Sequence, residues 1–232
     1  MDLFKRLSSS YPGLLVGLDL SGDARVGDLV PLLPRLSQLR SEGISLAVHL
    51  AEVPNHEETS AVLATNPDRI GTGDSVRVLL LNIFLFSGHG TCIHPSLGGS
   101  EDLWQQLTQV KCPVEVCLSS NVICQTVPTF QQHHAGLYIK HGLPVGKIVP
   151  SKPYLTSSFS LPVICTDDKG VFSCDLSQEL QTAATAFGLS RQELYQLSLD
   201  GLSYAFCGEE ERDKLRGEWQ HWRKENTHLF TH

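Results

Sequence analysis

The sequence lacks an apolar run long enough to cross a bilayer. Its longest is VLLLNIFLF at residues 78–86, whereas a membrane helix needs about 20 such residues. The first residues, MDLFKRLSSSYPG, contain no apolar core of signal-peptide length. No run of Lys or Arg stands out, and the formal net charge is -7. We therefore expect a soluble, cytosolic protein with neither a membrane nor a nucleic-acid partner.

The seven cysteines show no CxxC spacing, which argues against a zinc ribbon. An odd number at irregular intervals is typical of thiols in a reducing compartment. Cys117 and Cys165 each follow an apolar run and suit simple strand packing. A chain of 232 residues can bury a sizeable core, and we treat residues 1–232 as a single domain.

Apolar runs that end in polar residues predict strands covered on both faces. They occupy residues 14–20, 45–52, 113–121 and 161–168. Between the first two we expect a helix that is broken by Pro31 and Pro34 and stops at Gly43. Strands alternating with helices predict an α/β fold with a parallel sheet or a (β/α) barrel.

The last third of the sequence predicts helices. The expected segments are residues 175–187, a helix opened by the capping box that begins at Ser190, and residues 209–226. Trp219 and Trp222 lie three residues apart in the last of these, on one face. We interpret that stripe as packing in preference to a binding platform.

Polar side chains gather where the strands end, which is the edge at which parallel α/β folds bind ligands. The set comprises Asp19, His49, Glu52, Ser119, Asn121, Asp167 and Asp168. The adjacent acids Asp167 and Asp168 repel each other, so they either lie in a solvated turn or face a cation. His49 is either a satisfied core histidine or, with Glu52 nearby as acid or base, part of a zinc site for hydrolysis.

The motifs GLDLSGD (17–23), HLAEVPN (49–55), GHGT (88–91) and CTDDKGVF (165–172) resemble the adenosine deaminase family, in the family's order. HLAEVPN with TDDKGVF is most similar to the adenosine deaminase-like branch, the N6-methyl-AMP deaminases. The resemblance implies a zinc-dependent (β/α)8 barrel of the metal-dependent hydrolase superfamily. It also implies a cytosolic enzyme of nucleotide metabolism, monomeric in its full-length form.

The resemblance also implies roles for individual residues. His49 and Asp167 would bind Zn²⁺, Glu52 would protonate the purine at N1, and His89 would orient the attacking hydroxide. Asp168 would hold that hydroxide and bind the purine. Gly22 would let the purine approach the backbone, and Asp19 would support the site without touching the ligand. The implied reaction converts N6-methyl-AMP to IMP and methylamine.

The sequence departs from the family pattern in three places. None of the ten histidines forms the H-x-H pair that supplies two further zinc ligands, and LLVGLDL matches the family's fourth strand. We therefore expect a partial barrel that lacks roughly the first three strands. Residues 72–88 form an insertion, since removing them restores RIGHGT. Residues 135–161 diverge from the family and, being rich in Gly and Pro, predict an irregular loop.

Several alternatives follow from these departures. The chain could be an inactive, truncated form that binds a partner through its open barrel edge, or an adenosine deaminase that acts on the nucleoside. His94 suits a loop or a cap, and the pair His133 and His134 suits either a phosphate contact or the surface. Asn121 could cap the helix after its strand or touch the ligand.

Overall fold

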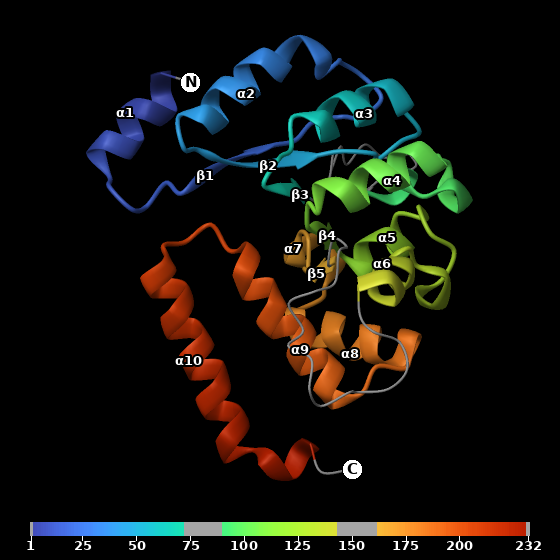
Figure 1. The fold of residues 1–232 in the computed structure, drawn as a ribbon. Helices are drawn as coiled ribbons and strands as arrows, with labels where there is room; N and C mark the ends of the chain where they lie inside the picture. Colours follow the sequence, from blue (N-terminus) through green and yellow to red (C-terminus); the bar gives the residue numbers. More distant parts are fainter. Residues whose placement is uncertain (1, 72–89, 143–161, 231–232) are drawn as a thin grey trace.

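The computed structural model describes residues 2–71, 90–142 and 162–230. In these residues, short parallel strands form one five-stranded sheet whose spatial order follows the chain (Figure 1). The strands are β1 (Gly17–Leu20), β2 (Ser45–His49), β3 (Arg69–Gly71), β4 (Val114–Val116) and β5 (Pro162–Ile164). The predicted α/β class and parallel sheet are confirmed, and a sheet wound in chain order is that of a partial (β/α)8 barrel.

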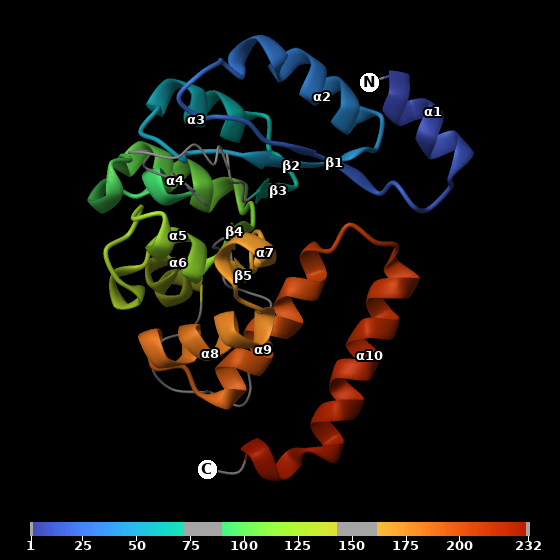
Figure 2. The same ribbon diagram turned by 180° about the vertical axis from the view of Figure 1, so that it is seen from behind.

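Helices connect the strands and extend beyond the last one. The α-helices are α1 (Asp2–Ser10), α2 (Leu33–Ser41), α3 (His56–Ala64), α4 (Glu101–Val110), α5 (Leu118–Ile123), α6 (Ala135–Gly142), α7 (Lys169–Phe172), α8 (Leu176–Phe187), α9 (Arg191–Gly201) and α10 (Glu209–Glu225). The 3-10 turns are η1 (Val30–Leu32), η2 (Thr91–Ile93), η3 (Pro95–Leu97), η4 (Phe130–Gln132), η5 (Leu202–Tyr204) and η6 (Thr227–Phe230). Both views show α2, α3 and α4 over one side of the sheet and α10 along the outside of the molecule (Figures 1 and 2). None of the described helices combines the length and apolarity that crossing a bilayer requires.

Alternation along the strands separates an apolar face from a polar one. The residues that enter the core beneath the helices are Leu46, Val48, Ile70, Val114, Val116 and Ile164. The other face carries charged side chains that pair across neighbouring strands: Asp19 with His49, and Arg69 with Glu115. In a closed barrel this second face lines the interior.

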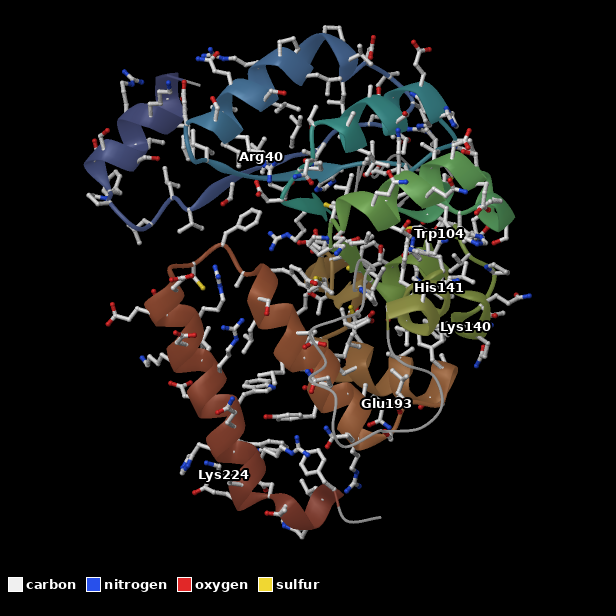
Figure 3. All side chains as sticks on the ribbon, viewed as in Figure 1. Arg40, Trp104, Lys140, His141, Glu193 and Lys224 are labelled. Atoms are coloured by element: carbon white, nitrogen blue, oxygen red, sulfur yellow. The ribbon has the colours of Figure 1, made fainter. Side chains whose placement is uncertain are left out.

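Side chains on the helices explain how the outer layer holds together. Trp104 of α4 is 9% exposed and stacks on Tyr138 of α6, with ring centroids 5.5 Å apart. It also meets His141 edge to face (Figure 3). This cluster fixes α6 against α4. The start of the range 135–161, expected as an irregular loop, is therefore helical, because Tyr138 and Ile139 bury their side chains. Residues 143–161 lie outside the described residues.

Strand lengths differ from expectation, most clearly in the third apolar run. The expected strand 113–121 ends at Val116, since α5 begins at Leu118. Ser119 and Asn121 consequently sit on a helical turn. The expected helix boundaries hold better: Pro31 and Pro34 mark η1 and α2, Gly43 has a φ of +82° directly after α2, and α9 opens with the predicted capping box at Ser190.

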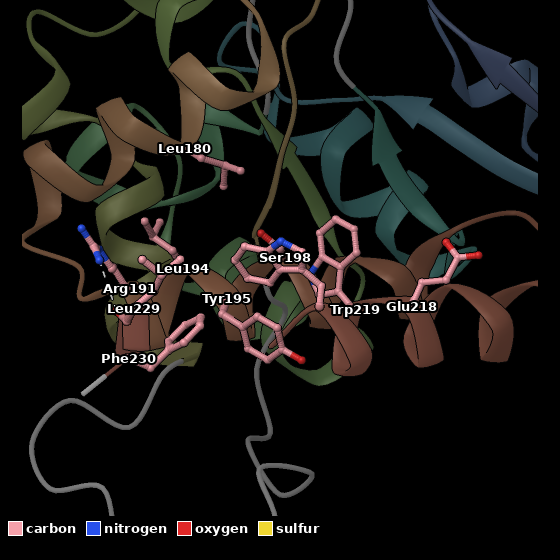
Figure 4. Close-up of a pocket in the computed structure, with 10 residues that line it drawn as sticks. Leu180, Arg191, Leu194, Tyr195, Ser198, Glu218, Trp219, Leu229 and Phe230 are labelled. Atoms are coloured by element: carbon pink, nitrogen blue, oxygen red, sulfur yellow. Dashed lines mark hydrogen bonds between the residues drawn. The ribbon is translucent and has the colours of Figure 1, made fainter. Parts of the chain in front are cut away.

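The predicted tryptophan stripe packs only in part. Trp219 and Trp222 are 40% and 47% exposed. They line a hollow of about 510 Å³ between α9, α10 and η6, together with Tyr195, Phe230 and other apolar side chains (Figure 4). Trp222 and Phe230 meet edge to face, with ring centroids 6.2 Å apart. This hollow contains none of the residues predicted for the site.

Candidate active site

At the β1–β2 end of the sheet, three predicted residues come together. His49, the last residue of β2, places Nε2 2.9 Å from Asp19 Oδ1 and Nδ1 3.5 Å from Glu52 Oε1. The side chains of His49 and Glu52 are 6% and 5% exposed, whereas that of Asp19 is 57% exposed. The parallel register brings Asp19 beside β2, so the contact follows from strand pairing.

The imidazole of His49 is governed by charge. Burial lowers its pKa, but the hydrogen-bonding and coulombic influence of Asp19 and Glu52 outweighs burial and raises the pKa to about 9. At neutral pH His49 is therefore a cation between two acids. Neither ring nitrogen has a partner that satisfies hydrogen-bond geometry. The two carboxylates therefore act on the imidazolium mainly through charge attraction, which depends weakly on orientation.

Gly71 makes the space that the His49 ring occupies. A Cβ built on Gly71, at the end of the neighbouring strand β3, would lie 2.6 Å from His49 Cδ2 and 2.9 Å from Nε2. Any side chain at position 71 would therefore displace the imidazole. No sequence pattern indicates this role, since the contact depends on the register His49↔Gly71 between β2 and β3.

A hollow of about 250 Å³ opens beside this cluster, between the loops that follow β1 and β2. Gly22, His49 and Glu52 line it, so three residues predicted for the site share one pocket. Its other acids are Asp23, Asp28 and Glu58, and the described lining contains no Lys or Arg. The pocket is smaller than typical small-molecule sites, which are roughly 300–1,000 Å³, and it is acidic.

The β4–β5 end holds Asp167 by hydrogen bonds. The Ser120 hydroxyl donates to Asp167 Oδ2 at 2.7 Å, and the Asp168 N–H donates to Asp167 Oδ1 at 3.0 Å. Asp167 has a φ of +57°, a left-handed conformation that is uncommon for a residue other than glycine. The Asp168 carboxylate accepts from the N–H groups of Gly170 and Val171 and caps α7. The two acids thus have different partners, and Asp168 is exposed.

Glu179 is a buried acid that the sequence analysis missed. Its side chain lies on α8 and is 0% exposed. It accepts from the Leu118 N–H at 2.7 Å and the Ser119 N–H at 3.2 Å. It thereby anchors the turn that presents Ser120 to Asp167. Its spacing in the sequence weakly indicates burial, because Glu179 lies four residues before Ala183 and therefore on the same, buried face of α8.

The remaining polar candidates have structural partners. Asn121 does not cap α5, because it lies inside that helix, where its side chain bonds Thr126 and His133. His133 and His134 are 2% and 1% exposed, so the surface interpretation of this pair is wrong. His94 is a cap, as expected: it accepts from the Ser96 N–H at the start of η3. The predicted His89 lies outside the described residues.

The predicted zinc ligands do not form a metal site in the described part of the chain. Imidazole and carboxylate are suitable zinc ligands, but His49 pairs with Asp19 and Glu52, and Asp167 pairs with Ser120. No group of three or more His, Cys, Asp or Glu side chains among residues 2–71, 90–142 and 162–230 is placed to hold a metal. A structural or catalytic zinc needs at least three protein ligands.

Comparisons with known proteins bear on this arrangement. A family model described as adenosine deaminase matches residues 5–222. The N6-methyl-AMP deaminases of Danio rerio and Homo sapiens are 39% and 38% identical to this chain over 90% and 95% of its length. The chain spans about half of each relative, 51% and 53%.

Solved structures also match nearly the whole of this chain. Arabidopsis ADAL complexed with IMP superposes with a TM-score of 0.72 at 27% identity, covering 97% of this chain and 54% of that one. An adenine deaminase from Arthrobacter aurescens, at 17% identity and a TM-score of 0.65, shares the fold. The structural match, like the sequence match, extends over about half of the other chain.

Proposed function

The chain belongs to the adenosine deaminase family, and from that premise we propose that it serves the hydrolytic removal of the 6-amino or 6-alkylamino group of a purine nucleotide. The favoured reaction converts N6-methyl-AMP to IMP and methylamine. The names of its relatives support this substrate, as does the IMP bound to Arabidopsis ADAL. We assign the activity to the cytosol because seven cysteines without CxxC spacing are typical of thiols in a reducing compartment.

The shared pocket of Gly22, His49 and Glu52 carries this proposal. Gly22 has nothing within 4 Å of the position a Cβ would occupy, so a flat ring can approach the backbone there. Glu52, almost fully buried beside the pocket, would donate a proton to ring nitrogen N1, which makes C6 more electrophilic. Asp168 would contact the purine from the far end of the sheet.

Zinc belongs to the proposal as the expected cofactor. When bound, it would supply hydroxide at neutral pH by lowering the pKa of its water to about 7. His49 and Asp167 would be two of its ligands, and His89 would orient the hydroxide. The described residues assemble no third ligand, so a third ligand would have to come from outside residues 2–71, 90–142 and 162–230.

A second candidate, deamination of the nucleoside, is favoured by the charge of the pocket. Its described lining has four acids, Asp23, Asp28, Glu52 and Glu58, which outnumber the one cation, His49, and it contains no Lys or Arg. A phosphate would be repelled there. Adenosine, which lacks the phosphate, avoids that cost.

The test is to incubate the purified chain with zinc and N6-methyl-AMP and to follow IMP, with adenosine as the competing substrate. We expect IMP formation that Glu52→Gln abolishes. Glu57→Gln, a substitution of an exposed carboxylate in the first turn of α3, should leave the rate unchanged. Turnover equal in the chain and in Glu52→Gln would overturn the proposal, and faster inosine formation from adenosine would select the second candidate.

A further inference from the structure

Two thiols meet at the carboxyl ends of the last two strands. Cys117 directly follows β4 and Cys165 directly follows β5, and the Cys165 N–H donates to the Val116 carbonyl at 3.0 Å. Burial raises the pKa of the Cys117 thiol, and the side chain of Cys165 is near enough to raise it further. Because Val116 pairs with Ile164, the two cysteines are direct neighbours across the ladder.

This placement is compatible with a disulfide. Neighbouring strands are about 4.8 Å apart, and the Cα atoms of bonded cysteines are usually about 4.4–6.8 Å apart. The two thiols also differ in access. Cys117 is 0% exposed, whereas Cys165 is half-buried, so a small oxidant in solution reaches Cys165 first.

We propose that Cys117 and Cys165 form an oxidative modification site, at which a peroxide converts the two thiols to a disulfide. The Cys165 sulfur attacks the peroxide, the O–O bond breaks, one oxygen becomes a sulfenic acid on Cys165, and one water leaves. The Cys117 sulfur then attacks that sulfenic sulfur and displaces a second water. Two thiols are oxidised, hydrogen peroxide is reduced, and both thiol protons leave in water.

A second thiol pair provides an internal comparison. Cys124 and Cys174 share an apolar cluster with Phe172, but both are buried, at 4% and 5% exposure. Neither is open to a peroxide in the way that Cys165 is, so we expect this pair to stay reduced. The oxidised pair would tie together the segments that lead into Ser120 and Asp167. This inference does not depend on the proposed reaction.

The test treats the chain with a few equivalents of hydrogen peroxide, blocks remaining thiols with iodoacetamide, and maps non-reduced peptides after trypsin and Glu-C. We expect the peptide with Cys165 to be linked to the peptide with Cys117, and dithiothreitol to reverse the link. Cys165→Ser should abolish it. Cys124→Ser, which changes a neighbouring thiol on the same peptide, should retain it.

Cys117→Ser, or Cys117→Ala if the serine variant is unstable, should leave a sulfenic acid on Cys165 that dimedone captures. Alkylation of both thiols in the peroxide-treated chain would overturn the proposal. A link between Cys124 and Cys174 in place of the expected one would overturn it as well. Disulfide mapping of the peroxide-treated chain without substitutions tests the proposal even if a variant fails to fold.

Discussion

The two ends of the sheet hold their candidate site acids in different ways. At the β1–β2 end, the imidazolium of His49 lies between the carboxylates of Asp19 and Glu52. At the β4–β5 end, Asp167 is held by the hydroxyl of Ser120 and the N–H of Asp168, and Glu179 anchors backbone N–H groups. The first end depends on charge, and the second depends on hydrogen bonds.

This difference has a physical consequence. A cluster held by charge responds to pH, since one proton on His49 decides whether the neighbouring acids are attracted. A cluster of hydrogen bonds responds to the loss of a single acceptor, since a buried N–H without a partner costs free energy. Different perturbations should therefore destabilise the two ends of the sheet: a change of pH for the first, and the loss of a hydrogen-bond acceptor for the second.

The largest effect is expected from Glu179→Ala. The substitution leaves the buried N–H of Leu118 and the part-buried N–H of Ser119 without their carboxylate acceptor, which should lower the free energy of unfolding by about 3 kcal/mol. Urea denaturation measures it. Glu210→Ala, at an exposed position of α10, should change stability by less than about 0.5 kcal/mol. Equal losses in the two variants would mean that Glu179 anchors nothing.

Gly71→Ala tests the steric basis of the β1–β2 end. The new Cβ would overlap the His49 ring, and we expect a loss of about 2 kcal/mol in the free energy of unfolding. The matched variant is Gly217→Ala in α10, where nothing lies within 4 Å and alanine should stabilise the helix by about 1 kcal/mol. If Gly71→Ala left the free energy of unfolding unchanged, the position of the His49 ring would not depend on the space at Gly71.

The pH dependence of stability separates the two ends directly. Because the pKa of His49 is raised from 6.5 to about 9, its stabilisation is complete below pH 6.5 and is lost as the pH rises through 9. Asp19 is largely exposed, so we expect a decrease of about 1–2 kcal/mol over that range. Denaturation at several pH values measures it. His49→Gln should remove this decrease, and an unchanged pH profile would contradict the assignment.

The smallest effect is expected from Ser120→Ala. Loss of the hydroxyl that bonds Asp167 should lower the free energy of unfolding by about 1 kcal/mol. The decrease between pH 6.5 and 9 should remain, because His49 is untouched. Ser37→Ala, at an exposed position of α2, serves as the control. A Ser120→Ala variant that flattened the pH profile would show that the two ends are coupled.

The sequence by itself determined the local features of this protein. Apolar runs with polar ends located β1, β2, β4 and β5 but missed β3, and the helix signals placed α8, α9 and α10 within about one residue of their observed starts. The motifs also gave the family, because the residues of each motif are adjacent in the chain. Residues 135–142 were mispredicted, because the burial of Tyr138 and Ile139 outweighs the local Gly and Pro signal.

Only the tertiary structure decided which residues meet. The space for the His49 ring exists because Gly71 lies opposite it on the next strand. The turn that carries Ser120 is anchored by Glu179 from a helix distant in the chain. Cys117 and Cys165 are neighbours because Val116 pairs with Ile164. Each contact joins residues far apart in the chain, and each depends on strand register or helix packing. Those are set by the burial of the whole core, which no short stretch of sequence encodes.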